Sequence, residues 1–123
     1  MEGERRILLV EDEDDIAILL SRRLESEGYS VTRVADGVQA MQAAMRLRPS
    51  LIILDLMLPG GGGLSVLRKI RRSYLTQSIP VIVLTGMQDD DHKKQVIEFG
   101  VEGYLQKPYD PAELLASIEG LIE

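Results

Sequence analysis

The chain has 123 residues, with 14 Lys and Arg against 20 Asp and Glu, and therefore a formal net charge of −6. Its length fits one compact domain, and its 45% hydrophobic and 28% charged residues exclude a disordered or low-complexity chain. The negative charge disfavours direct binding to nucleic acid or anionic lipid, and the lack of cysteine excludes disulfides, thiolate metal sites and thiol catalysis.

The sequence shows no recognisable targeting or membrane segment. No apolar run reaches the roughly 18 residues that a membrane span needs. The first residues, MEGERR, lead into a short apolar run and then into EDEDD, without the apolar region and cleavage site of a signal peptide. We therefore expect a cytoplasmic protein that does not contact a membrane, with residues 1–123 forming a single domain and no effector domain visible.

Short apolar runs alternate along the chain with segments of helical spacing. In chain order, strands are expected at residues 7–10, 31–34, 51–54, 81–84 and 103–106, and helices around residues 16–24, 38–45, 64–70, 96–99 and 114–121. Gly28 and Gly100 precede two of the strands, where a glycine commonly ends a helix, and Pro111 suits the first turn of the last helix. Five strand–helix units predict a mostly parallel sheet with helices on both faces, a three-layer α/β/α sandwich.

Charged and polar residues follow four of the five predicted strands. They are Glu11-Asp12-Glu13, Asp55, Thr85-Gly86 and Lys107-Pro108. Ligands of open parallel sheets bind beyond the carboxyl ends of the strands, so we expect these residues to meet at one site. Converging carboxylates repel one another, and a hard cation offsets that repulsion, which predicts Mg²⁺ with Mn²⁺ as an alternative ion.

Such a site is suited to phosphoryl transfer. Asp55 would act as the nucleophile and form an acyl phosphate. Thr85 and Lys107 would bind the phosphoryl oxygens and, with the metal, spread their charge.

The motifs that carry these residues resemble the receiver domains of two-component response regulators, the CheY-like superfamily. They read ILLVEDE, LIILDLMLPG, VIVLTG and GYLQKP, in this order, and the resemblance covers essentially all 123 residues. It implies a flavodoxin-like, doubly wound parallel sheet of five strands in the order 2-1-3-4-5. It also implies a signalling domain rather than a turnover enzyme, with only self-catalysed phosphoryl transfer and slow autodephosphorylation.

The resemblance assigns a metal role to four residues. Asp12 and Asp55 are expected to ligate Mg²⁺ directly, together with the backbone carbonyl of Met57, whereas Glu11 acts mainly through water. Two further acidic residues, Asp14 and Asp15, are interpreted as charges that complement the start of the first helix.

The resemblance also implies a switch. Thr85 and Lys107 contact the phosphoryl group on Asp55, and Tyr104 moves inward when Thr85 moves. The response then changes a binding surface formed by the fourth helix, the fifth strand and the fifth helix. The peptide bond before Pro108 is expected to be cis.

The partners implied are a sensor histidine kinase or phosphotransfer protein as phosphodonor, and a downstream target protein or a missing effector domain. The domain is expected to be a monomer or a phosphorylation-dependent dimer. The chain has Ala112 and Ser117 where receivers of the transcription-factor subgroup carry arginines on their dimer face, which disfavours that form of dimer. Four glycines follow Pro59, and Gly62 lacks a capping side chain, which predicts a mobile loop.

Two other functions fit this sequence less well. A phosphatase of the haloacid dehalogenase type needs a second Asp two positions after the first, and that position is Met57. A flavodoxin-like electron carrier needs a polar, uncharged phosphate loop, where this chain has the acidic residues 11–13. A receiver-like protein-binding module that works without phosphorylation remains the alternative. The basic residues Arg68, Lys69, Arg71 and Arg72 are interpreted as the solvated face of the third helix.

Overall fold

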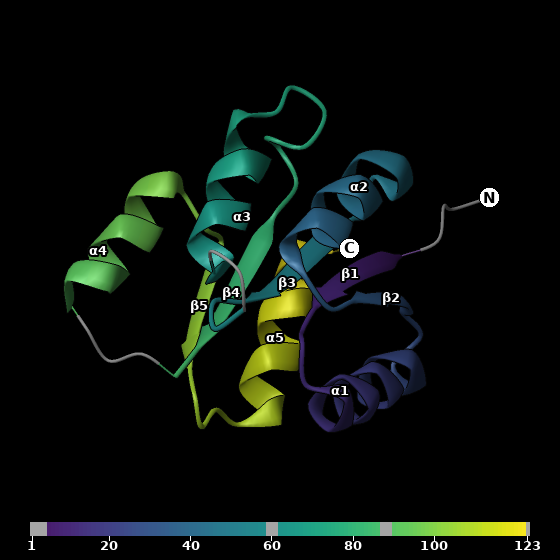
Figure 1. The fold of residues 1–123 in the computed structure, drawn as a ribbon. Coiled ribbons are helices and arrows are strands. Elements are labelled where there is room, and N and C mark those ends of the chain that lie inside the picture. The colour runs from purple at the N-terminus through teal and green to yellow at the C-terminus, as the bar shows by residue number, and fades with distance from the viewer. Residues whose placement is uncertain (1–4, 59–61, 87–89, 123) are drawn as a thin grey trace.

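The computed structural model describes residues 5–58, 62–86 and 90–122, which form a parallel sheet covered by helices on both faces (Figure 1). The elements in chain order are β1 (Arg6–Val10), α1 (Asp14–Ser26), β2 (Ser30–Val34), α2 (Gly37–Leu47), β3 (Leu51–Asp55), α3 (Gly62–Arg72), β4 (Val81–Thr85), α4 (Asp90–Phe99), β5 (Gly103–Gln106) and α5 (Pro111–Leu121). Within this part of the chain, no helix is both long and apolar enough to cross a membrane.

The five strands pair in parallel in the order β2-β1-β3-β4-β5, the order that the resemblance to receiver domains implies. β3 lies at the centre, with Ile53 opposite Leu9 of β1 and Ile82 of β4. Since every strand runs in the same direction, all five carboxyl ends lie at one edge of the sheet. Asp55, the last residue of β3, is therefore at the middle of that edge.

The core has two halves, one on each face of the sheet. In β3, Leu51 and Ile53 pack on the side of α1 and α5, whereas Ile52 and Leu54 pack on the side of α2, α3 and α4. All four are fully buried, which explains why this strand reads as a continuous apolar run rather than as an alternating one.

The turn residues act as the sequence predicts. Gly28 and Gly100 adopt positive φ angles of 95° and 83°, a conformation that L side chains rarely adopt. Asp110 caps α5 by accepting a hydrogen bond from the backbone N–H of Ala112 at 2.9 Å, and Pro111 occupies the first turn. The strand boundaries differ slightly, because Asp55 and Thr85 are the last residues of β3 and β4 rather than the first residues beyond them.

The start of α3 packs very closely against the end of β3. A Cβ added to Gly63 would lie 2.5 Å from the Cα of Leu56 and 2.8 Å from the carbonyl oxygen of Asp55. The backbone N–H of Gly63 donates to the Leu56 carbonyl at 3.0 Å. A glycine is therefore required here for α3 to approach the site. The mobile loop expected after Pro59 falls mostly on residues 59–61, outside the described residues.

Candidate metal and phosphoryl site

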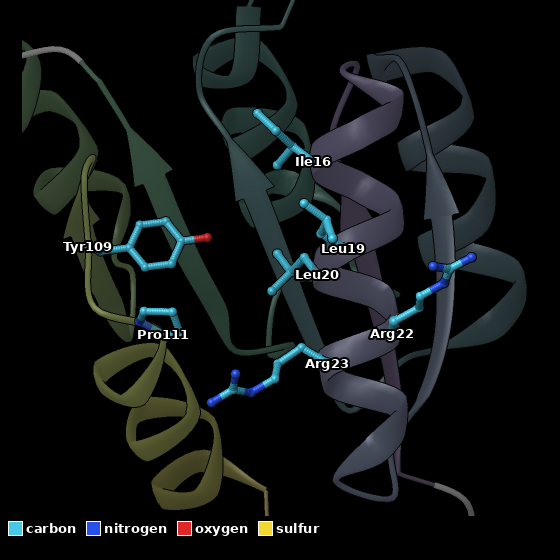
Figure 2. A pocket seen from close by; sticks show the side chains of 7 residues that line it. All are labelled: Ile16, Leu19, Leu20, Arg22, Arg23, Tyr109 and Pro111. Atoms are coloured by element: carbon cyan, nitrogen blue, oxygen red, sulfur yellow. The ribbon is translucent and has the colours of Figure 1, made fainter.

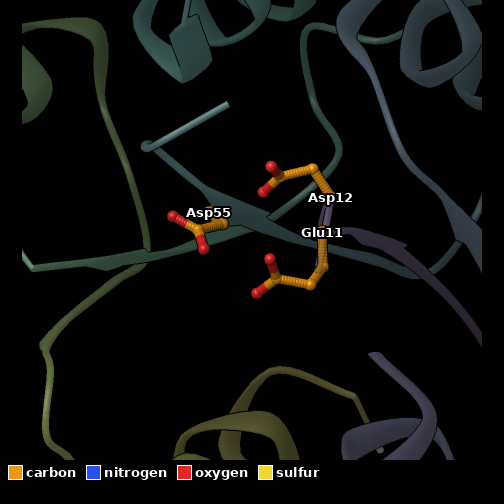
Figure 3. Close-up of side chains that lie close together, drawn as sticks. All are labelled: Glu11, Asp12 and Asp55. Carbon is orange, nitrogen blue, oxygen red and sulfur yellow. The ribbon is translucent and has the colours of Figure 1, made fainter. Parts of the chain in front are cut away.

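Three carboxylates converge at the carboxyl edge of the sheet, as predicted. One oxygen from each of Glu11, Asp12 and Asp55 lies within 4.8 Å of the others, and Figure 3 shows the three side chains gathered at the ends of β1 and β3. Glu11 and Asp55 are 1% and 2% exposed, whereas Asp12 is exposed to solvent. An all-oxygen donor set that is open on one side fits a hard divalent cation such as Mg²⁺, which keeps water or phosphate oxygens in its remaining positions.

Lys107 supplies the positive charge at this edge. Its Nζ lies 2.6 Å from Oδ2 of Asp55 and 3.9 Å from Oε1 of Glu11. The Lys107–Pro108 peptide bond is cis, as predicted, and the Lys107 N–H donates to the Thr85 carbonyl at 2.8 Å. We call the group formed by Glu11, Asp12, Asp55 and Lys107 the acidic cluster. It holds three carboxyl groups and a single ammonium.

The protonation of Glu11 is shifted mainly by its burial. Burial of its carboxyl, together with the charge of Asp55, raises its pKa from 4.5 to about 7, although the hydrogen bond from the Glu13 N–H and the charge of Lys107 act in the opposite direction. Burial also disfavours the charged form of Lys107, but its hydrogen bond to Asp55 and the nearby carboxylates outweigh that effect and raise its pKa. The cluster is thus short of positive charge at neutral pH.

A backbone donor orients the Asp55 carboxylate. The N–H of Met57 donates to Oδ1 at 2.8 Å, so one oxygen is held by this amide and the other by Lys107. The Met57 side chain is about half exposed. The structure thus brings Met57 to the site through its amide, and the predicted use of its carbonyl as a metal ligand stays a prediction.

Thr85 and Tyr104, the predicted switch residues, lie on neighbouring strands. Thr85 is fully buried at the end of β4. Tyr104 pairs with Val83 in the parallel register, is partly buried, and packs against the half of the core that contains Val83. Because side chains alternate along a strand, Thr85 and Val83 point to the same face. Tyr104 is therefore beside the face from which the Thr85 side chain projects.

Two arginines have contacts that the sequence analysis did not anticipate. Arg33, at the end of β2, donates from Nε to the backbone carbonyl of Glu11 at 2.8 Å. The sequence signal is a single charged residue in the strand SVTRV.

The prediction that the basic residues of α3 form a solvated face is wrong for Arg71. Its side chain is 14% exposed, and its Nη2 lies 2.9 Å from Oε1 of Glu102. It also donates to the carbonyl groups of Gly100, Gln77 and Ile79. Arg68 and Lys69, in contrast, are exposed, as expected of a solvated face.

A groove lies between α1 and α5, and some of its lining residues follow Lys107 closely in the sequence. It has a volume of about 550 Å³, and Figure 2 shows its lining residues, with Tyr109 facing α1. They are Ile16, Leu19, Leu20, Arg22, Arg23, Tyr109 and Pro111. Tyr109 follows the cis peptide directly, so the groove adjoins the segment that carries Lys107.

Comparisons with known proteins agree with the fold. Residues 7–119 match the response regulator receiver domain family. The DNA-binding dual master transcriptional regulator RpaA of Synechocystis is 40% identical over 117 residues, covering 95% of this chain and 48% of RpaA. The phosphate regulon transcriptional regulatory protein PhoB of Pseudomonas aeruginosa is 36% identical over 118 residues, covering 96% of this chain and 52% of PhoB. The chain spans about half the length of the curated relatives it matches.

A solved structure of the same kind contains a metal. It is the receiver domain of a sensor histidine kinase from Pseudomonas aeruginosa PAO1, described with a magnesium ion coordinated in the active site cleft. It superposes with a TM-score of 0.87 at 35% identity, covering 97% of this chain and 98% of that one.

Proposed function

The chain belongs to the response regulator receiver domain family of two-component signalling, and from this premise we propose that it accepts a phosphoryl group on Asp55. The observation that carries this assignment is the geometry around the Asp55 carboxylate. One of its oxygens accepts from the Met57 amide and the other from Lys107, and two further carboxyl groups lie close by. Receiver domains are phosphorylation-based signalling modules, and the alternative of a module that works without phosphorylation is not favoured.

The proposed transfer is a displacement at phosphorus. An oxygen of the Asp55 carboxylate attacks the phosphorus of a phosphohistidine, and a P–O bond forms as the P–N bond breaks. The electron pair of the broken bond stays on the imidazole nitrogen, which takes up a proton. Lys107 and the backbone amide of Met57 stabilise the charge of the oxygens during transfer. Hydrolysis of the same acyl phosphate by water would return Asp55 to its starting state.

The donor set of the site supports Mg²⁺ as the cofactor, with Mn²⁺ as an alternative. Asp12, Asp55 and the carbonyl of Met57 would hold the ion, and Glu11 would contact it through water. A bound Mg²⁺ supplies positive charge to the transferring phosphoryl oxygens. The surplus negative charge of the acidic cluster supports this proposal, because Lys107 alone cannot balance its carboxylates.

We propose Thr85 and Tyr104 as the residues that report phosphorylation. An acyl phosphate carries more negative charge and more acceptor oxygens than the carboxylate it replaces, and the Thr85 hydroxyl can donate to it. Movement of Thr85 would open space next to the strand that carries Tyr104. The change would reach the surface formed by α4, β5 and α5, as a shift in the populations of two states.

The partners proposed are a sensor histidine kinase or phosphotransfer protein as the donor and a target protein or an effector domain as the output. Leu19, 69% exposed, helps to line the groove between α1 and α5, which we propose as the docking surface for the donor because it adjoins Lys107 (Figure 2). RpaA and PhoB are named as transcriptional regulators, which supports an output in transcription. We also propose that residues 1–123 form one receiver domain and that it works in the cytoplasm. The domain is proposed to be a monomer or to dimerise on phosphorylation.

Intact-mass spectrometry tests the assignment. The wild type and Asp55→Asn are incubated with acetyl phosphate, in Mg²⁺ and in chelator. We expect one phosphoryl adduct on the wild type, dependent on Mg²⁺, labile to hydroxylamine and missing from the variant. A phosphoryl adduct of equal yield on Asp55→Asn would overturn the assignment. The assignment would also be overturned if neither acetyl phosphate nor a phosphohistidine donor gave any adduct on the wild type.

A further inference from the structure

Arg33 makes two contacts with the segment that follows β1. Its Nε donates to the backbone carbonyl of Glu11 at 2.8 Å, and its Nη1 lies 2.8 Å from Oδ1 of Asp14 in the first turn of α1. Arg33 projects from β2, an edge strand, and its side chain is 27% exposed. A single guanidinium thus spans the peptide that leads into Asp12 and the start of the following helix.

The backbone of Glu11 is held to β2 at both of its polar groups. Its N–H donates to the carbonyl of Val34 at 3.0 Å, and its carbonyl accepts from Arg33. The first contact continues the pairing of β1 with β2, but the second depends on a side chain. Because the Glu11 carbonyl belongs to the peptide whose nitrogen is that of Asp12, fixing it restricts the direction in which the Asp12 carboxylate leaves the strand.

The contacts of Arg33 contribute unequally to the stability of the fold. The carboxylate of Asp14 is 79% exposed, and an ion pair with so exposed a partner contributes little to stability. Another nitrogen of the guanidinium, Nη2, is buried without a hydrogen-bond partner, which opposes folding. The net contribution of Arg33 to folding is therefore small, and the bond to the Glu11 carbonyl is its main structural contact.

We propose that Arg33 is a positioning residue for the metal site, holding the Glu11–Asp12 peptide so that both carboxylates face Asp55. The inference rests on the proposed function, since it assigns a purpose to the same site. The rigid, planar fork of arginine suits this task because it can bond a carbonyl and a carboxylate together, whereas a lysine offers one flexible ammonium.

Two substitutions at Arg33 test the proposal. Arg33→Met keeps the length of the side chain and removes every donor, and Arg33→Lys keeps the charge with a single donor group. Arg46→Met is the matched control, because Arg46 is an exposed arginine of α2 that lines a surface hollow together with Arg33. Each full chain is titrated with Mg²⁺ by calorimetry at about pH 8, where Glu11 is mostly ionised, and its thermal unfolding is recorded in chelator.

We expect Arg33→Met to weaken Mg²⁺ binding by about tenfold, as losses of groups that orient metal ligands do. Arg33→Lys should recover part of that affinity, Arg46→Met should match the wild type, and melting in chelator should change little in all three.

Two outcomes would overturn the proposal. Unchanged or stronger Mg²⁺ binding by Arg33→Met would mean that the guanidinium acts only as a repelling charge. A lowered melting temperature with unchanged affinity would mean a structural role alone. Failure of the wild type itself to bind Mg²⁺ would instead remove the proposed function on which the inference rests.

Discussion

Two charged clusters lie at opposite ends of the central strands, and they are built differently. At the amino end of β4, Arg71 pairs with Glu102 and donates to three backbone carbonyls, while Glu102 also accepts from the Val81 N–H at 2.7 Å. At the carboxyl ends, the acidic cluster places Glu11 and Asp55 in the interior with Lys107 as the cation.

The charge balance of the two clusters indicates that one supports the fold and the other forms the functional site. The Arg71–Glu102 pair balances its charges and leaves the guanidinium well supplied with acceptors, which stabilises the joint between α3, β4 and the turn before β5. The acidic cluster carries more negative than positive charge, and the pKa of Glu11 is raised mainly by its burial and further by the charge of Asp55. Groups arranged at a cost in stability are typical of sites that bind or react, and groups that are mutually satisfied are typical of structural support.

The largest expected effect comes from removing the cation of the acidic cluster. In Lys107→Ala, we expect Mg²⁺ still to bind, phosphoryl transfer to slow on the order of 100-fold, and the response of β5 to be lost. The reason is that the Lys107 ammonium, which alanine removes, contacts Asp55 directly from a position one residue beyond the end of β5. Transfer is followed by intact mass, and the response by amide chemical shifts of β5 after addition of beryllium fluoride. Unchanged shifts relative to the wild type would contradict the role of Lys107 in the switch.

At the other cluster, Arg71→Ala should lower the free energy of unfolding by about 2 kcal/mol, since hydrogen bonds from a charged donor to several carbonyls are lost. Urea denaturation in chelator measures this. Arg72→Ala, an exposed neighbour on α3, serves as the control and should change stability little. If Arg71→Ala reduced the affinity for Mg²⁺ as strongly as it reduces stability, the Arg71–Glu102 pair would not be a purely structural cluster.

The protonation of Glu11 should make metal binding depend on pH. Its raised pKa means that its contribution to folding is present in full below pH 4.5 and is lost as the pH rises through about 7. Mg²⁺ competes with the proton on Glu11, so the affinity for Mg²⁺ should fall by about tenfold for each pH unit below about 7. Calorimetric titrations on both sides of neutrality measure the slope, and Glu11→Gln should flatten it. An equal slope in the variant would assign the proton to another group.

The sequence predicted the fold well because its signals are local and repeated. Apolar runs such as residues 51–54 and 81–84 have few alternatives to buried parallel strands, and Gly28 and Gly100 mark the helix ends. The convergence of Glu11, Asp12, Asp55 and Lys107 followed from the rule that parallel strands end at one edge. The strand order came from the resemblance to a family, since alternation of strands and helices does not determine it.

The contacts that sequence analysis missed are those made by long side chains across elements. Arg33 is separated from Glu11 by 22 residues and Arg71 from Glu102 by 31, and no spacing rule links such pairs. The identity of the Arg71 acceptors, three of them backbone carbonyls, depends on loop geometry that forms only when the sheet is assembled. The proton affinity of Glu11 was equally hidden, because it depends on burial that one strand does not specify.

Whether the acidic cluster binds the metal is tested by measuring how Mg²⁺, relative to chelator, changes the thermal stability of the wild type, Arg71→Ala and Asp55→Asn at about pH 8. Binding to the folded state at 100 times its dissociation constant adds about 2.7 kcal/mol. We expect the wild type and Arg71→Ala to gain equal stability, although the variant starts lower, and Asp55→Asn to gain much less. An equal gain in Asp55→Asn, or none in the wild type, would contradict the claim that the acidic cluster is the metal and phosphoryl site.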